Sequence, residues 1–244
     1  MKILCLGDSL TSGSVGHTYV RFLDSRIDAI NKGKNGDTIR GAYRRLKRYL
    51  RNPKYSSIST YVVWIGVNDL LGPYLSTLSL LWKLLMKPRC AYKHCLGEDA
   101  PFAAAYEKVL DLLERNGKKA ILVGMPLVQI AGFPPKRILA RNAVIKNLAK
   151  SRGLPYVDAY SIQRGAQRHP KEAYSWGKFW HKRALDAAVM MLLPRTKDGF
   201  ARRRHLSLTV DGIHLNSRSA RLLAAEISRQ VLLLSEETQR GRGV

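Results

Sequence analysis

A serine directly follows the first predicted strand of the chain. The stretch "LCLGDSLTSG" spans Leu4 to Gly13, and its apolar residues lead into Gly7, Asp8 and Ser9. Open α/β sheets bind ligands at the carboxyl ends of their strands, so this position suits a reactive group. A serine hydroxyl becomes a good nucleophile only when a base removes its proton and a third group orients that base. The remainder of the chain must therefore supply a histidine and an acid.

One of the six histidines has an acid at a suitable spacing. In "TVDGIHLN", Asp211 lies three residues before His214. In a turn or at the start of a helix, this spacing lets the carboxylate accept one imidazole N–H and leaves the other ring nitrogen free for Ser9. The other histidines lack such a companion, and we expect them at the surface: His17, His94, His169, His181 and His205.

Two further loops could donate hydrogen bonds to the oxyanion that forms when a serine attacks a carbonyl group. Gly36, in "AINKGKNGDT", has no side chain to keep a ligand away from its backbone N–H. Asn68, in "VVWIGVND", follows another apolar run, and its side-chain amide is a donor. If all strands are parallel, both residues emerge at the same sheet edge as Ser9. Taken alone, Gly36 and Asn68 are each also typical of an ordinary turn.

The elements that must position these residues alternate along the chain. The apolar runs predict five buried strands, at 2–6, 27–31, 61–66, 119–124 and 155–158. Helical patterns fill the gaps, at about 15–26, 38–51, 102–116, 137–151 and 217–235. This alternation predicts an α/β fold, a three-layer α/β/α sandwich around a mostly parallel five-stranded sheet. We expect one domain over residues 1–235 and a flexible tail over 236–244.

Two segments, near 70–100 and 161–205, do not fit a minimal three-layer sandwich and are predicted to be insertions. The first predicts an amphipathic helix with a basic end, too short and too polar on one side to span a membrane. The second places aromatic residues beside lysines and arginines. Both segments could pack on the core as plain helices, or could form a substrate cap or a membrane-docking surface. On the second interpretation, the candidate substrate contacts are Leu71, Leu75, Trp82, Trp176 and Trp180.

The charge of the chain is strongly positive, because 42 lysines and arginines face 18 acids, a formal net charge of +24. Such a field attracts polyanions, including anionic lipid surfaces, although it can also serve solubility alone. No recognised DNA- or RNA-binding module accompanies it, so we expect no specific nucleic-acid partner. Residues 38–51 carry a basic face without an acid, which is either solvated or in contact with phosphates: Arg40, Arg44, Arg45, Lys47, Arg48 and Arg51.

The cysteines and the first residues indicate in which cellular compartment we expect the protein. Met1 and Lys2 lead directly into a strand without a secretory signal, which predicts a cytoplasmic protein, peripheral to a membrane if the insertions dock there. Cys90 and Cys95 could close a small loop, but reduced thiols are typical of the cytoplasm. His94 lies between them without an evident fourth ligand. We expect no metal and no organic cofactor.

Four stretches taken together resemble the GDSL esterase/lipase family, the SGNH hydrolases. "GDSLT" is similar to its nucleophile block, "NKGKNGDT" to its glycine block, "GVND" to its asparagine block and "DGIHLN" to its last block. The blocks occur in the family's order and span nearly the whole chain. The resemblance implies a flavodoxin-like fold and a triad of Ser9, His214 and Asp211. It also implies an oxyanion hole made by the Ser9 and Gly36 backbone N–H groups and the Asn68 side chain.

The resemblance implies a serine ester hydrolase acting on a small-molecule or lipid ester, and leaves the substrate open. Family members cleave simple esters, lipids, thioesters and acetyl groups on sugars, so a lipase-like enzyme and a deacetylase of small or carbohydrate esters are both compatible. A non-catalytic relative that binds anionic ligands is a third alternative. A nucleotide-binding α/β protein fits less well, because no G-x-G-x-x-G follows the first strand.

Overall fold

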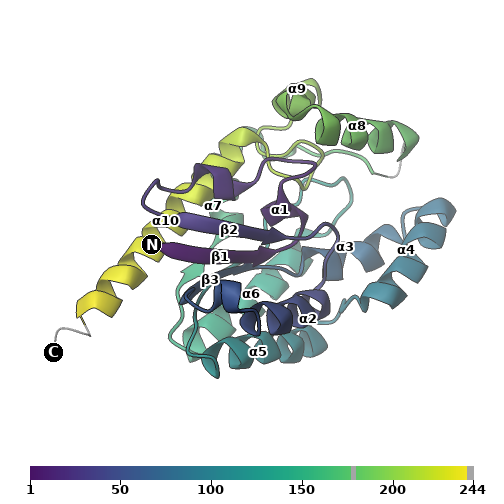
Figure 1. The fold of residues 1–244 in the computed structure, drawn as a ribbon. Coiled ribbons are helices and arrows are strands. Elements are labelled where there is room, and N and C mark those ends of the chain that lie inside the picture. Colours follow the sequence, from purple (N-terminus) through teal and green to yellow (C-terminus); the bar gives the residue numbers. More distant parts are fainter. Residues whose placement is uncertain (177–179, 241–244) are drawn as a thin grey trace.

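The fold is built on one parallel sheet of five strands. The computed structural model describes residues 1–176 and 180–240, and the side chains of residues 1–176 and 182–236. The strands are β1 (Lys2–Gly7), β2 (Asp28–Gly33), β3 (Thr60–Trp64), β4 (Lys119–Val123) and β5 (Tyr156–Val157). They lie in the order β2-β1-β3-β4-β5 (Figure 1), which is the flavodoxin-like order. The predicted parallel sheet is confirmed.

Helices cover both faces of this sheet (Figure 1). On one face α2 (Ile39–Leu50), α5 (Asp99–Glu114) and α6 (Pro135–Ser151) pack side by side. On the other face α10 (Ser217–Arg240) contacts α7 (Ala159–Ala166) and a 3-10 turn at Tyr19–Phe22. The predicted three-layer sandwich is therefore confirmed. The last helix continues to Arg240, so it overlaps the segment from 236 that we expected to be a tail.

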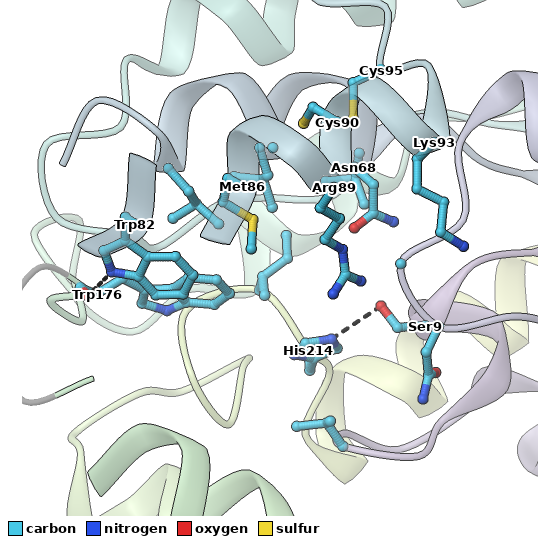
Figure 2. Close-up of a pocket in the computed structure, with 18 of the residues that line it drawn as sticks. Ser9, Asn68, Trp82, Met86, Arg89, Cys90, Lys93, Cys95, Trp176 and His214 are labelled. Carbon is cyan, nitrogen blue, oxygen red and sulfur yellow. Dashed lines mark hydrogen bonds between the residues drawn. The ribbon is translucent and has the colours of Figure 1, made fainter. Parts of the chain in front are cut away.

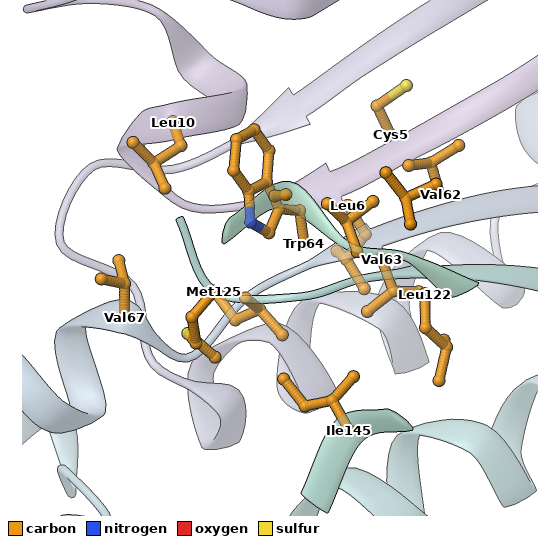
Figure 3. Packing of buried hydrophobic residues seen from close by; sticks show 14 of the residues in the cluster. Cys5, Leu6, Leu10, Val62, Val63, Trp64, Val67, Leu122, Met125 and Ile145 are labelled. Atoms are coloured by element: carbon orange, nitrogen blue, oxygen red, sulfur yellow. The ribbon is translucent and has the colours of Figure 1, made fainter. Parts of the chain in front are cut away.

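The core lies between the strands and both helix layers. Every residue of β3 is buried, as its apolar and β-branched composition predicts for a strand covered on both faces. Figure 3 shows Trp64, at the end of β3, among Leu10, Val67 and Met125. The sheet therefore ends in a packed layer immediately beneath Ser9 and Asn68, which follow β1 and β3.

The predicted helix at 15–26 is wrong, because the chain forms only the 3-10 turn there. Backbone groups of this segment bond to distant residues in place of helical partners. The N–H of His17 donates to the carbonyl of Leu215 at 2.7 Å, and the Lys197 ammonium donates to the carbonyls of Gly13 and Gly16. The segment is thereby tied to the loop that carries His214, a contact invisible to local periodicity.

The charged face predicted for residues 38–51 is solvated only in part. Arg45 is buried instead, and its guanidinium binds the Asp37 carboxylate at 2.7 Å and the carbonyls of Lys32 and Gly7. One side chain thus joins β1, β2 and the start of α2. Arg40, Arg44, Lys47 and Arg48 are exposed, which is compatible with either a solvated face or contact with phosphates.

The first insertion forms two helices in place of one. α3 (Val67–Leu75) and α4 (Leu80–Lys93) are separated at Ser76–Ser79, where the Ser79 hydroxyl accepts from the Trp82 N–H and caps α4. The single continuous apolar face therefore does not form. Leu71, Leu75 and Trp82 are buried, whereas Leu85 is exposed.

The second insertion contains α7, α8 (Trp180–Leu192) and α9 (Lys197–Arg203). Met190, Ala201 and Val210 form a small apolar cluster of their own, separate from the main core. Trp176 packs in the main core. Trp180 begins α8, but its side chain lies outside the described part of the structure.

Candidate active site

Ser9 stands at the turn between β1 and the short helix α1 (Ser9–Ser12). The Asp8 carboxylate caps this helix by accepting from the Leu10 N–H at 3.0 Å. Ser9 is 8% exposed and lines a pocket. Its own N–H is the first donor of α1 and has no acceptor among the described residues, so it points to where a ligand oxygen could bind.

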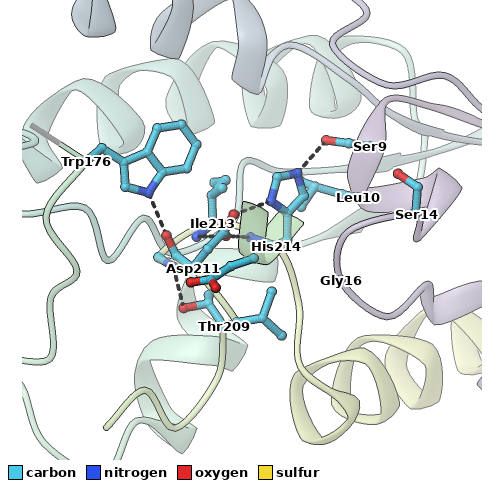
Figure 4. A network of polar contacts seen from close by, with 12 residues as sticks. Ser9, Leu10, Ser14, Gly16, Trp176, Thr209, Asp211, Ile213 and His214 are labelled. Carbon is cyan, nitrogen blue, oxygen red and sulfur yellow. Dashed lines mark hydrogen bonds and ion pairs between the residues drawn. The ribbon is translucent and has the colours of Figure 1, made fainter. Parts of the chain in front are cut away.

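The structure brings the three predicted reactive groups into one hydrogen-bonded chain (Figure 4). Nε2 of His214 lies 3.0 Å from Oγ of Ser9, and Nδ1 of His214 lies 2.9 Å from Oδ2 of Asp211. The spacing from Asp211 to His214 works because a tight turn reverses the chain, with Gly212 at φ +92°. His214 is thus positioned to take a proton from Ser9 while Asp211 holds the opposite ring nitrogen.

Asp211 is buried and firmly oriented. Its Oδ1 accepts the backbone N–H groups of Ile213 and His214, and the Trp176 indole N–H donates to its backbone carbonyl at 2.6 Å. Burial opposes ionisation of this carboxyl group, but the charge and hydrogen bonds of His214 and the charge of Arg183 hold its pKa well below the usual range. The group is therefore an anion that can stabilise an imidazolium.

Gly36 presents its backbone to the same pocket. Its φ is +63°, a left-handed conformation that glycine adopts without strain. Its N–H has no acceptor among the described residues. The next residue, Asp37, is fixed by Arg45, so the buried ion pair holds this loop in place. The sequence did not reveal this support, since Arg45 resembles its exposed neighbours.

Asn68 follows β3 and faces the pocket, as predicted, but its amide is already engaged. Nδ2 donates to the Asp37 carbonyl at 2.9 Å and to Asp8 Oδ2 at 3.2 Å. A substrate oxygen must therefore share or replace one of these acceptors. The longer bond, to Asp8, is the easier one to give up.

Asp8, one of the two acceptors of the Asn68 amide, is a carboxyl group with an unusually high pKa. It is fully buried, and burial raises its pKa to about 7 against the opposing effect of the Leu10 N–H and the charge of His214. The nearby charges of Asp37 and Asp69 act in the same direction as burial. Sequence reasoning assigned Asp8 no role, although it links the cap of α1 to the amide of Asn68.

A cavity of about 240 Å³ opens beside Ser9 and His214 (Figure 2). Four of the five predicted substrate contacts line it, namely Leu71, Leu75, Trp82 and Trp176. Trp82 and Trp176 stack with ring centroids 5.9 Å apart, and the Trp82 indole N–H donates to the Trp176 carbonyl. The two insertions therefore meet in one wall of the pocket. The fifth contact, Trp180, falls outside the described side chains.

The pocket also contains residues that were not predicted as contacts. Met86 joins the tryptophans at one end, and Arg89 and Lys93 lie toward the other (Figure 2). The signal was present, because Trp82, Met86, Arg89 and Lys93 recur at helical spacing. The sequence pattern predicted Arg89 only as part of the basic end of an amphipathic helix, and it gave Lys93 no role.

Cys90 and Cys95 line the pocket as free thiols that lie within hydrogen-bonding reach of each other. No cluster of His, Cys, Asp or Glu among the described residues is arranged to hold a metal ion.

The sheet order and the Ser–His–Asp hydrogen-bonded chain at its carboxyl edge define an α/β protein with side chains of the kind that nucleophilic catalysis uses. The profile of the GDSL-like Lipase/Acylhydrolase family matches residues 5–222, so the chain belongs to that family. The matched range contains Ser9, Gly36, Asn68, Asp211 and His214.

Solved structures share the fold at low sequence identity. The acetyl xylan esterase AlAXEase is 16% identical, with a TM-score of 0.57 over 93% of this chain and 98% of its own. A GDSL-like lipase from Bacteroides thetaiotaomicron is 17% identical, with a TM-score of 0.56 over 97% and 88%. The lipase/acylhydrolase from Enterococcus faecalis is 20% identical, with a TM-score of 0.54 over 94% of each chain. No curated protein sequence matches the chain.

Proposed function

We propose that this member of the GDSL-like family is a serine hydrolase of carboxylic esters, with Ser9 as nucleophile, His214 as base and Asp211 as the group that orients His214. The observation that carries the proposal is the chain of two short hydrogen bonds from Ser9 through His214 to the buried Asp211. Family membership supports acyl ester hydrolysis in general.

In the proposed mechanism, Ser9 Oγ attacks the ester carbonyl carbon while His214 Nε2 takes its proton. The carbonyl oxygen becomes an oxyanion that accepts from the Ser9 and Gly36 N–H groups and the Asn68 amide. His214 then protonates the leaving alcohol, and a water molecule activated by His214 releases the acid from Ser9. Asp211 stabilises the imidazolium in both steps.

The pocket favours an acyl group larger than acetyl. Its wall of Leu71, Leu75, Trp82 and Trp176 offers apolar surface beside the reactive serine. A series of chromogenic esters from acetyl to octanoyl, tested on wild type and Ser9→Ala, examines both the preferred acyl length and the role of Ser9. We expect kcat/KM to rise with chain length in wild type and to vanish in the variant.

Deacetylation of small or carbohydrate esters is the second candidate. It is supported by the acetyl xylan esterase among the similar structures, which shares the fold and covers nearly the same length. A preference for acetyl over longer acyl esters, in the same series, would favour this candidate over the first.

We also propose that the enzyme docks on anionic lipid surfaces. Figure 1 shows α4 and α8 beyond the carboxyl ends of the strands. Each exposes leucines, among them Leu84 at 64% and Leu185 at 65%, and Lys83 and Lys87 are exposed on α4. Exposed apolar side chains mixed with cations are typical of interfacial helices. None of the helices within the described residues combines the length and apolarity needed to cross a bilayer.

A further inference from the structure

The two ends of the pocket differ in chemistry (Figure 2). Trp82, Met86 and Trp176 form an apolar end, whereas Arg89 and Lys93 bring positive charge next to Ser9 and His214. A substrate that fits both ends must be apolar on one side of its scissile bond and anionic on the other. A neutral ester would leave the cations without a counterpart.

Arg89 is exposed to solvent, but its side chain lies along the protein surface and reaches the Gly36 loop. Its guanidinium lies against the α-carbon of Gly36, so closely that any side chain at position 36 would collide with Nη2. Figure 2 shows it pointing toward the space between Ser9 and His214. The cation therefore stands at the entrance to the proposed oxyanion hole, where the substrate must pass.

Within the described residues, no carboxylate lies within ion-pair distance of Arg89 or Lys93. The nearest acid on the facing loop, Asp37, is already paired with the buried Arg45. Partial burial lowers the pKa of Lys93, the positive charges of Lys34, Arg89 and Arg44 act in the same direction, and the negative charge of Asp37 opposes them. Because Asp37 is already paired with Arg45, it compensates this cluster of like charges only in part, and an anionic ligand would relieve the remainder.

Arg183 also lines the pocket but is engaged elsewhere. Its guanidinium lies over the Trp176 ring at 3.3 Å from the centroid, and it interacts electrostatically with Asp211. It therefore supports the apolar wall and the buried acid. Among the cations that line the pocket in the described part of the chain, Arg89 and Lys93 remain to meet a substrate.

We propose that Arg89 and Lys93 select esters whose alcohol part carries a phosphate group, with the acyl chain held at the apolar end. The proposal rests on the esterase function above and specifies its substrate class. A guanidinium binds phosphate oxygens through two parallel N–H donors, and the lysine adds a point charge. Arg89 and Lys93 act as specificity residues, and the bond-breaking steps remain with Ser9 and His214.

The test compares two esters that differ only in the phosphate group on the glycerol, 1-octanoylglycerol 3-phosphate and 1-octanoylglycerol. Both are used as dissolved monomers so that no lipid surface contributes. We expect wild type to favour the phosphate ester in kcat/KM by about 10- to 100-fold, the range of charge-assisted hydrogen bonds. Arg89→Gln should lose most of this ratio and Lys93→Gln part of it. Arg48→Gln, which removes an exposed cation on α2 outside the pocket, should keep it.

Glycerol 3-phosphate and inorganic phosphate provide a second readout. Glycerol 3-phosphate should competitively inhibit hydrolysis of the neutral ester by wild type. It should no longer inhibit a variant that combines Arg89→Gln with Lys93→Gln. Inorganic phosphate should inhibit wild type more weakly than glycerol 3-phosphate does. Equal kcat/KM for the two esters in wild type would overturn the proposal. An equal loss on both esters in Arg89→Gln would also overturn it, because Arg89 would then serve the oxyanion itself.

A failure of the proposed esterase function can be distinguished from a failure of the phosphate proposal. If Ser9→Ala hydrolyses the neutral ester as well as wild type does, the esterase mechanism is wrong. If wild type cleaves a chromogenic butyrate in a Ser9-dependent manner but cleaves neither octanoyl ester, the esterase stands and the phosphate proposal falls.

Discussion

His214 and Ser9 are separated by 205 residues in the chain, yet Nε2 of one lies 3.0 Å from Oγ of the other. If this contact transfers the proton, Ser9→Ala and His214→Ala should each lower kcat/KM for a chromogenic ester by about 10³-fold or more. Ser9→Ala should change thermal unfolding little, whereas His214→Ala also removes a partner of the buried Asp211 and should lower the unfolding temperature. Circular dichroism at the assay temperature checks that both variants remain folded. A variant that kept a tenth of wild-type activity would contradict the proposed roles.

Asn68→Ala should lower kcat by about 10²- to 10³-fold with little change in KM, because a lost oxyanion donor affects only the transition state. Steady-state kinetics on one neutral ester measures both constants. A raised KM with normal kcat would show that the amide binds the ground state, or only ties Asp8 to Asp37.

Arg45→Met should destabilise the protein by about 3–5 kcal/mol, because it leaves the buried Asp37 carboxylate without its partner. The free energy of unfolding in urea measures the loss. Arg48→Met, on the exposed side of the same helix, is the matched control and should change stability by less than about 0.5 kcal/mol. Similar losses in both variants would show that the buried pair contributes no special stability.

Asp8 gives stability a particular pH dependence. Its pKa in the folded protein is about 7, above the value near 4 of an unfolded aspartate, so the folded state binds more protons between these values. The contribution of Asp8 is therefore fully present below pH 4 and is lost as the pH rises through 7. Relative to Asp8→Asn, wild type should lose up to about 4 kcal/mol over this window. Urea unfolding at several pH values checks the slope, and a flat or rising difference would contradict it.

Docking on anionic lipid should depend on the leucines exposed by α4 and α8. Leu84→Asp and Leu185→Asp should each reduce sedimentation with anionic vesicles, because a carboxylate replaces apolar contact and is repelled by the surface. Leu233→Asp, at an exposed leucine near the far end of α10, should bind as wild type does. Neutral vesicles or high salt should abolish binding. Equal sedimentation of all variants would assign the attraction to net charge alone.

The sequence predicted the features that depend on short patterns. The five strands and the sites of Ser9, Gly36 and Asp211 could be located because apolar runs and their terminal residues are local signals. Packing decided the rest. Arg45 is buried while Arg48 is exposed, and only the neighbouring strand and Asp37 distinguish them. The segment at 15–26 has a helical pattern, but the His17 N–H bonds to Leu215 and the Gly16 carbonyl bonds to Lys197 instead.

The residues of the pocket also divide into those that a sequence pattern predicts and those whose position depends on packing. Leu71, Leu75 and Trp82 were predicted as contacts, although the helix that carries them breaks at Ser76–Ser79 and so turns the following residues toward Ser9. That change of direction places Arg89 against Gly36. The sequence could identify Arg89 as a basic residue, but its position depends on the break.

The stacked indoles of Trp82 and Trp176 have a consequence for how such a chain can diversify. Trp82 belongs to the first insertion, Trp176 to the second, and the latter donates its indole N–H to the backbone of Asp211. Replacing either segment alone would leave a ring face or an N–H group without its partner and disturb the acid behind His214. Related chains that differ here should therefore differ in both segments together, so that new specificities arise by exchange of a matched pair and not loop by loop.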